Sequence, residues 1–204
     1  MKKEEILKYV TPKRKDCGPY RWVALQAFII KYNLKKIAEI GIYKAWSTLG
    51  ILSGVETKNI VKEYWGIDPY FSKKSCPYPS ELDKQTVVWG DFRYEHALKY
   101  TMKYPQFRLL RLTADKASKL FEPEYFDLVF IDGDHGHTCV RNDILNWLPL
   151  IRKGGFITGH DYVLDGKCRH DGVREVVNDI FGKENIIVTG VDSVWAYMKE
   201  KKNA

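Results

Sequence analysis

Residues 126–137 read FDLVFIDGDHGH, an apolar run followed directly by Asp, Gly and His residues. The apolar run predicts a short buried strand, since it is too short for a helix and rich in residues that favour strands. The polar residues cannot continue that strand, so two carboxylates and two imidazoles should lie near its C-terminal end. Ligands bind at that edge of open α/β sheets, and we therefore expect the chemical centre here.

Strand and helix patterns alternate along the rest of the chain. The expected strands lie at residues 36–41, 63–68, 107–112, 126–131, 156–159, 185–189 and 194–198. The expected helices lie at residues 4–10, 21–32, 47–55, 92–104, near 118, 140–151 and 172–181. This alternation predicts an α/β fold, a doubly wound, three-layer, Rossmann-like sandwich with a seven-stranded, mostly parallel sheet and an antiparallel C-terminal hairpin. Lys153-Gly154-Gly155 is expected to end the helix that precedes the fifth strand.

Length and composition favour a single domain. The chain has 204 residues, of which 45% are hydrophobic, and this suits one sizeable core. We expect one domain over residues 1–204, with an N-terminal helical cap at 1–35 and the core at 36–199. Residues 70–83 are rich in Ser, Lys, Pro and aromatic residues and predict a lid loop within that core.

The charge and the cysteines limit the classes of partner and compartment. The net charge is +7, with Lys and Arg residues crowding both ends. Solvated tails explain such runs better than nucleic acid, which is therefore not an expected partner. Residues 1–15 lack an apolar h-region, and no apolar run reaches membrane-spanning length. Because the four cysteines form no C-x-x-C pair, we expect a reduced, cytoplasmic protein. Whether Cys76 and Cys168 pair is left open.

The first strand runs into a turn with the pattern Glu39-x-Gly41-x-x-x-Ala45-x-Ser47. The glycine would let backbone N–H groups approach a ligand, and the following helix would add its positive dipole. The pattern is not G-x-G-x-x-G, which lowers the odds of NAD or FAD. The competing interpretation is an ordinary βα turn in which Glu39 is a satisfied polar group.

Two more carboxylates follow expected strands. Asp68 ends the second strand, where an acid in nucleotide-binding α/β folds accepts hydrogen bonds from ribose hydroxyls. Alternatively, Asp68 and Pro69 merely begin a turn. Asp115 follows the third strand and could contact the exocyclic amine of adenine, or could cap the short helix after it.

The fifth expected strand ends in His160 and Asp161, beside the strand that ends in Asp132. At adjacent strand ends, Asp132 and Asp161 could share a hard divalent cation. His135 could then take the proton of a bound hydroxyl group, because a free imidazole titrates near neutral pH. A turn explains any one of these residues, but it explains the whole group less readily.

Taken together, the motifs resemble class I S-adenosylmethionine-dependent methyltransferases. The resemblance is carried by the turn at 39–47, Trp65-Gly-Ile-Asp68-Pro-Tyr70, the stretch 127–135, Gly154-Gly155 with His160-Asp161-Tyr162, and Gly172-Val173-Arg174. The branch that looks most similar includes macrocin-type sugar O-methyltransferases and relatives of cephalosporin hydroxylase. The similarity covers most of the chain, from about residue 37 to residue 198.

The resemblance implies a role for each motif residue. The residues expected to bind S-adenosylmethionine are Glu39, Gly41 and Ser47 around its methionine part, Asp68 at the ribose, Asp115 near adenine, and Asp132. In metal-dependent members the position of Asp132 is a metal ligand and that of His135 a general base, so these two are the expected catalytic residues. His160 and Asp161 fall where two further metal ligands usually stand.

Two residues depart from the family pattern. His160 replaces an expected oxygen ligand, the kind that Mg²⁺ prefers. Either His160 points away and Asp134 compensates, or the metal resembles Mn²⁺, or there is none. Ala45 replaces a glycine, and its methyl group fits if the backbone stays in an ordinary region.

The predicted function is methyl transfer from S-adenosylmethionine to a hydroxyl group of a small molecule or sugar, assisted by a divalent metal such as Mg²⁺ or Mn²⁺. Two alternatives stay open. One is a non-haem iron hydroxylase-like relative, because histidines and carboxylates together also hold iron. The other is a nucleoside-binding protein with nucleic-acid contacts. A homo-oligomer is compatible with the sequence.

Overall fold

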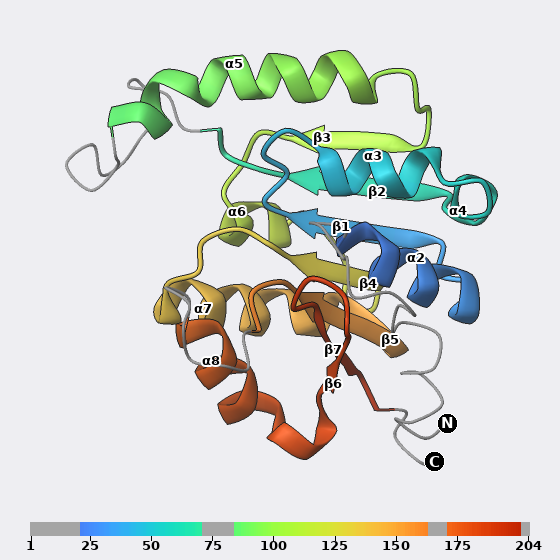
Figure 1. Cartoon of the computed structure of the whole chain (residues 1–204), viewed down its shortest axis with the longest axis vertical. Coiled ribbons are helices and arrows are strands. Elements are labelled where there is room, and N and C mark those ends of the chain that lie inside the picture. The colour runs from blue at the N-terminus through green and yellow to red at the C-terminus, as the bar shows by residue number, and fades with distance from the viewer. Residues whose placement is uncertain (1–20, 71–83, 163–170, 201–204) are drawn as a thin grey trace.

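A computed structural model describes residues 21–70, 84–162 and 171–200. Three expectations fall outside these ranges: the helix at 4–10, the lid loop beyond Tyr70, and the pairing of Cys76 with Cys168. Within the described ranges, helices cover both sides of a central sheet (Figure 1).

The sheet has seven strands in the order β3-β2-β1-β4-β5-β7-β6. Its strands are β1 (Lys36–Ile40), β2 (Glu63–Ile67), β3 (Phe107–Leu110), β4 (Phe126–Ile131), β5 (Ile151–Gly159), β6 (Ile187–Val188) and β7 (Trp195–Met198). β1 to β5 run parallel, whereas β7 pairs antiparallel with both β5 and β6. The doubly wound, mostly parallel sheet with antiparallel C-terminal strands is thus confirmed. The strand order reverses between β1 and β4, and ligands bind at such a switch point in open sheets.

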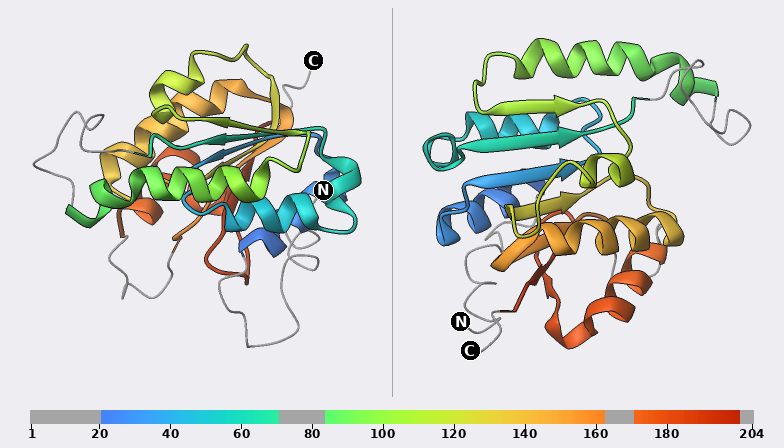
Figure 2. Two further views of the ribbon diagram at one scale, coloured as in Figure 1. Left: turned by 90° about the horizontal axis from the view of Figure 1, so that it is seen from above. Right: turned by 180° about the vertical axis from the view of Figure 1, so that it is seen from behind.

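The helices pack on the two faces of the sheet, as Figure 2 shows from two further sides. The helices are α2 (Arg21–Tyr32), α3 (Trp46–Ser53), α4 (Thr57–Ile60), α5 (Lys84–Thr101), α6 (Ala114–Ser118), α7 (His137–Trp147), η1 (Leu148–Leu150), α8 (Asp171–Phe181) and η2 (Lys183–Asn185). Among the described residues, no helix is both long enough and apolar enough to cross a membrane. The short α4 was not expected from the sequence.

Strand β4 shows how the two cores form. Its successive side chains point to opposite faces, as in any strand. Leu128 and Phe130 join a buried cluster with α2 and α3, whereas Val129 and Ile131 join a second cluster with α7 and α8. A strand covered on both faces is apolar at its buried positions, which explains the apolar residues of β4. Its one charged residue, Asp127, lies near its start and pairs with Arg152.

The expected boundary between helix and strand near residue 151 is wrong. Helix α7 ends at Trp147, one 3₁₀ turn containing Pro149 follows, and β5 already begins at Ile151. Proline cannot donate to a helix and so ends it early. Gly154 and Gly155 therefore lie inside β5 instead of closing a helix. The Gly154 N–H donates to the carbonyl of Lys199, and the Gly155 carbonyl accepts from the Lys199 N–H.

Candidate active site

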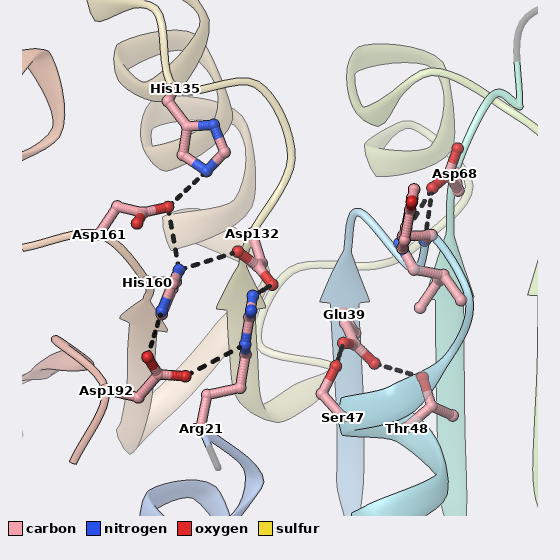
Figure 3. Close-up of polar contacts among 12 residues, drawn as sticks. Arg21, Glu39, Ser47, Thr48, Asp68, Asp132, His135, His160, Asp161 and Asp192 are labelled. Carbon is pink, nitrogen blue, oxygen red and sulfur yellow. Dashed lines mark hydrogen bonds and ion pairs between the residues drawn. The ribbon is translucent and has the colours of Figure 1, made fainter. Parts of the chain in front are cut away.

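The carboxylates and histidines named by the sequence gather where parallel strands end, and Figure 3 shows this edge in close-up. Glu39 lies in β1, and Asp68 directly follows β2. Asp132 follows β4 in the same way, and His160 follows β5. The edge thus has two halves, one at β1 and β2 and one at β4 and β5.

The turn between β1 and α3 lies close against the end of β4. Gly41 has φ +90°, and a Cβ atom there would lie 2.3 Å from the carbonyl oxygen of Asp132. Only glycine fits this position, because a side chain would meet rigid backbone. The Asp132 N–H donates to the carbonyl of Ile40 at 2.8 Å, which holds the two strand ends together.

The backbone of Ala45 does not lie in the ordinary region that its methyl group was expected to require. Ala45 has φ 61° and ψ 30°, in the left-handed region, at the position before the first helical residue of α3. Its side chain is also fully buried. Left-handed backbone strains any residue with a Cβ atom, so this alanine carries strain that a glycine would avoid.

Glu39 is completely buried, and its carboxylate accepts hydrogen bonds from three hydroxyl groups, those of Ser47, Thr48 and Tyr64. Burial without a counter-charge raises the pKa of Glu39 to about 7, although the hydroxyl groups oppose this. The carboxyl group therefore fastens the first turn of α3 to β1 and β2. Its contact with the methionine part of a cofactor stays a prediction, as does that of Ser47.

Asp68 organises the same turn from the end of β2. Its Oδ2 accepts from the backbone N–H groups of Ile42 at 3.1 Å and Tyr43 at 2.9 Å, and its Oδ1 accepts from that of Tyr70 at 2.8 Å. Burial raises the pKa of Asp68, with these bonds acting in the opposite direction. A carboxylate oxygen has two lone pairs, so Oδ2 is fully used and Oδ1 keeps one lone pair for a ribose hydroxyl.

Asp115 is exposed in the first turn of α6. Thr113, not Asp115, occupies the cap position of that helix, so the capping alternative is wrong. A hydrogen bond from Thr113 lowers the pKa of Asp115. Its proposed contact with adenine stays a prediction.

In the second half of the edge, histidines lie between carboxylates (Figure 3). The Nε2 atom of His135 is 2.6 Å from Oδ2 of Asp161, and Nδ1 of His160 is 2.9 Å from the same oxygen. His160 also lies 3.4 Å from Oδ1 of Asp132 through Nδ1, and 3.3 Å from Oδ1 of Asp192 through Nε2. His160 is thus surrounded by three carboxylates.

Arg21 completes this network. Its Nη1 pairs with Oδ2 of Asp132, and its Nε lies 3.6 Å from Oδ2 of Asp192. Neither Arg21 nor Asp192 was named as a candidate from the sequence. Arg21 is the first residue of α2, 111 positions away from its partner, and no spacing in the sequence relates the two.

The pKa values of this half follow from its charges. Burial disfavours protonation of His160, yet the three carboxylates outweigh it and raise the pKa to about 11. The hydrogen bond with Asp161 raises the pKa of His135. Burial alone would raise the pKa of Asp161, but its contacts with the two histidines hold it well below the usual range.

Three side chains of this half lie close enough together to hold a divalent metal ion. Asp132, His135 and Asp161 each offer one ligand atom, and these atoms lie within 4.8 Å of one another. His160 is not part of this group, and Asp134 is exposed with its Oδ1 accepting from the N–H of Gly136 at 2.7 Å. Two carboxylates with one imidazole fit an ion that accepts nitrogen, such as Mn²⁺, better than Mg²⁺.

A small pocket adjoins this group. It is lined by residues from the end of β4, the loop after it, α7, α8 and β7: Ile131, Asp132, Gly133, Asp134, His135, Val140, His160, Val173 and Trp195. The pocket is thus lined by the candidate base His135 and the candidate metal ligand Asp132, beside the turn whose Gly41 packs against the end of β4.

A family model described as a methyltransferase domain matches residues 38–162, more than half of the chain. The chain therefore belongs to this family of methyltransferase domains. The match spans β1 through β5 and so includes both halves of the strand-end edge.

Individual relatives are distant. An uncharacterized protein of Acanthamoeba polyphaga mimivirus is 29% identical over 128 residues, which cover 61% of this chain and 50% of that protein. An uncharacterized protein of Sinorhizobium fredii is 24% identical over 128 residues, which cover 62% of this chain and 13% of that protein. The chain thus spans at most half the length of these two relatives.

Solved structures share the fold. A methyltransferase of Podospora anserina bound to S-adenosylhomocysteine superposes with a TM-score of 0.62 at 16% identity, covering 98% of this chain and 88% of that one. An O-methyltransferase of Bacillus cereus, also with S-adenosylhomocysteine, gives a TM-score of 0.55 at 18% identity, covering 97% and 90%. At such identities the likeness establishes the Rossmann-like methyltransferase fold.

Proposed function

We propose that the chain is an S-adenosylmethionine-dependent O-methyltransferase that methylates a hydroxyl group of a small molecule or sugar. The observation that carries the proposal is that Asp68, at the glycine turn, and the pair His135 and Asp161 lie along one edge of the sheet. Membership of a methyltransferase family supports it, as do the two solved structures with S-adenosylhomocysteine. The macrocin-type branch, a cytoplasmic location and a homo-oligomer stay predictions.

The cofactor would lie over the first half of the edge. Gly41 lets the turn pack closely against the end of β4, and the methionine part would lie at this turn, near Glu39 and Ser47. Asp68 would accept from a ribose hydroxyl with the one lone pair that its backbone bonds leave on Oδ1. Asp115, at the start of α6, would lie near adenine.

The chemistry would take place over the second half. His135 would take the proton from the acceptor hydroxyl, and that oxygen would attack the sulfonium methyl in line. The new C–O bond forms as the C–S bond breaks, and S-adenosylhomocysteine leaves without charge. Asp161 holds the His135 ring in place, and because it raises the pKa of His135, alkaline pH favours the free base. Positioning would supply much of the acceleration.

Metal assistance is part of the same proposal. Asp132, His135 and Asp161 would hold the ion, which when bound makes a hydroxyl group more acidic. His135 cannot bind the ion and take the proton at the same time. The two carboxylates contribute whether His135 is a metal ligand or the base, so both versions of the mechanism depend on Asp132 and Asp161.

Calorimetry with S-adenosylhomocysteine, with and without Mn²⁺, tests the cofactor assignment. We expect one-to-one binding that does not need the metal, because the cofactor would lie mainly over the first half of the edge. Absence of binding under both conditions would contradict the proposal. A panel of catechols and sugars with radiolabelled S-adenosylmethionine would then identify the acceptor class.

The mixed set of ligand atoms at Asp132, His135 and Asp161 keeps the hydroxylase-like alternative in view. Imidazole with carboxylate is a donor set that non-haem iron uses. Elemental analysis of the purified protein and a 2-oxoglutarate turnover assay distinguish the two functions. Bound iron together with 2-oxoglutarate consumption would replace the methyltransferase proposal.

A further inference from the structure

Both carboxylate oxygens of Asp132 already face side-chain nitrogen atoms. Oδ2 pairs with the guanidinium of Arg21, and Oδ1 lies 3.4 Å from Nδ1 of His160. The Asp132 side chain is only 10% exposed. A divalent ion that binds Oδ2 therefore has to compete with the guanidinium of Arg21, and one that binds Oδ1 has to fit beside His160.

Of the two, His160 is the more firmly held. It follows β5 directly, its backbone N–H donates to the carbonyl of Ile131 at 3.1 Å, and its side chain is 12% exposed. Its ring also lies between Asp161 and Asp192, which give it two further counter-charges. Displacing His160 would break contacts with several carboxylates at once.

Arg21 can leave Asp132 more easily. Its side chain is long, is 28% exposed and begins at the first residue of a helix. A second carboxylate, that of Asp192, already lies 3.6 Å from its Nε. The guanidinium stays charged at every working pH, and it can keep a counter-charge at Asp192 after losing Asp132.

We propose that Arg21 is a built-in competitor of the metal ion. Its guanidinium neutralises Asp132 in the ion-free protein and moves onto Asp192 when an ion takes Asp132. The inference rests on the proposed metal assistance of the active site, and it assigns to Arg21 and Asp192 a role in setting metal affinity. The competition weakens metal binding, because part of the binding free energy is spent on breaking an ion pair.

The test is calorimetric titration of the cofactor-free protein with Mn²⁺ alone. Arg21→Met removes the competing charge while keeping much of the side-chain volume, and we expect it to tighten Mn²⁺ binding by about tenfold or more. Adding Asp132→Asn to this variant should abolish the gain. Arg152→Met is the matched control, because Arg152 pairs with Asp127 at the opposite end of β4. Its affinity for Mn²⁺ should equal that of the wild type.

A second variant tests Asp192, the carboxylate that would receive the guanidinium of Arg21. Its result can be interpreted even if Arg21→Met does not fold. Asp192→Asn removes the position to which Arg21 moves, so it should weaken Mn²⁺ binding by about tenfold in the wild-type background. The same change should matter much less when combined with Arg21→Met, and a double-mutant cycle measures the difference. Mn²⁺ affinity that is unaffected by either single change, or no Mn²⁺ binding in any variant, would overturn the inference.

Binding of S-adenosylhomocysteine to the same samples separates this inference from the proposed function. If the cofactor product binds but Arg21→Met leaves Mn²⁺ affinity unchanged, the competition is wrong and the methyltransferase proposal stands. If Arg21→Met binds Mn²⁺ more tightly and no variant binds S-adenosylhomocysteine, the competition stands and the cofactor assignment fails.

Discussion

The two halves of the strand-end edge hold their carboxylates by different means. Glu39 and Asp68, in the first half, accept hydrogen bonds from hydroxyl and backbone N–H groups, and burial raises the pKa of both. Asp161 and Asp192, in the second half, face histidine or arginine, and these charges lower the pKa of both although burial acts against them. Partner charge, more than burial, therefore decides in which direction a buried carboxyl group titrates. The first half can serve as a fixed frame, and the second half is where protons and ions can be exchanged.

The largest expected effect is on turnover in the second half. His135→Ala should lower kcat by about 10²–10⁴, the usual contribution of a general base, and leave S-adenosylhomocysteine binding unchanged. Single-turnover kinetics and calorimetry measure the two quantities separately. His137→Ala is the matched control, since His137 is exposed in the first turn of α7 and should change neither. Wild-type kcat in His135→Ala would remove the assigned base.

The next effect is on stability and comes from the first half. Because the pKa of Glu39 rises from 4.5 to about 7 on folding, the folded chain keeps a proton in this window that the unfolded chain has lost. The contribution of Glu39 to stability should therefore fall as pH rises from about 4.5 to about 7, by roughly 3 kcal/mol, and then level off. Denaturant unfolding across this range measures it, and Glu39→Gln should remove that part of the fall. An identical pH dependence in both proteins would mean that Glu39 is ionised in the fold.

Asp161 should respond to pH with the opposite sign. Its pKa is lowered on folding, so the stability it contributes is present above its ordinary pKa and is lost as pH falls below it. The two halves thus define an intermediate pH at which the edge is most stable. This contrast gives the Glu39→Gln experiment an internal reference, because the acid side of the profile should be unaffected.

A smaller effect is expected on cofactor affinity. Asp68→Ala removes the acceptor of three backbone hydrogen bonds that hold the β1–α3 turn, together with the proposed ribose contact. We expect S-adenosylhomocysteine to bind about tenfold to a hundredfold more weakly, measured by calorimetry. Asp68→Asn keeps one oxygen acceptor and should give an intermediate loss. Unchanged affinity in both variants would show that the cofactor does not use this carboxylate.

The smallest expected effect is on thermal stability and concerns only the turn at Ala45 in the first half of the edge. Ala45→Gly relieves left-handed backbone strain, and we expect a gain of up to about 1 kcal/mol after allowing for the more flexible unfolded chain. Ala24→Gly, within helix α2, is the comparison and should lose at least about that amount, because it also removes a buried methyl group. Thermal unfolding of the two variants should therefore shift Tm in opposite directions. A lower Tm for Ala45→Gly would mean that the turn is not strained.

Much of the fold could be predicted because a buried strand is visible in the local sequence as a short run of mostly apolar residues. The strands β1, β2 and β4 are apolar at most positions and are followed by Gly41, Asp68 and Asp132, so strand positions and the functional edge followed from them. The start of β5 could not be predicted in the same way. Gly154 and Gly155 resemble a helix stop, and their true partner, Lys199, lies far away in the chain.

The site shows the same limit. Asp132, His135 and Asp161 could be grouped because adjacent parallel strands bring their ends together. Arg21 could not, because a helix pattern fixes which face is apolar but not what its first side chain meets. The unusual position of His160 was visible as a departure from the family pattern, although the presence of Asp192 on its far side was not.

The network around His160 also has a consequence for how the molecule assembles. Its members come from α2, the ends of β4 and β5, and the segment before β7. During synthesis Arg21 and Asp132 are made well before Asp192, which lies between β6 and β7, so the network can close only after that segment has been made. Contacts between such distant residues form late, because long loops must first be closed. A nascent chain that ends before Asp192 would therefore lack one of the three carboxylates around His160.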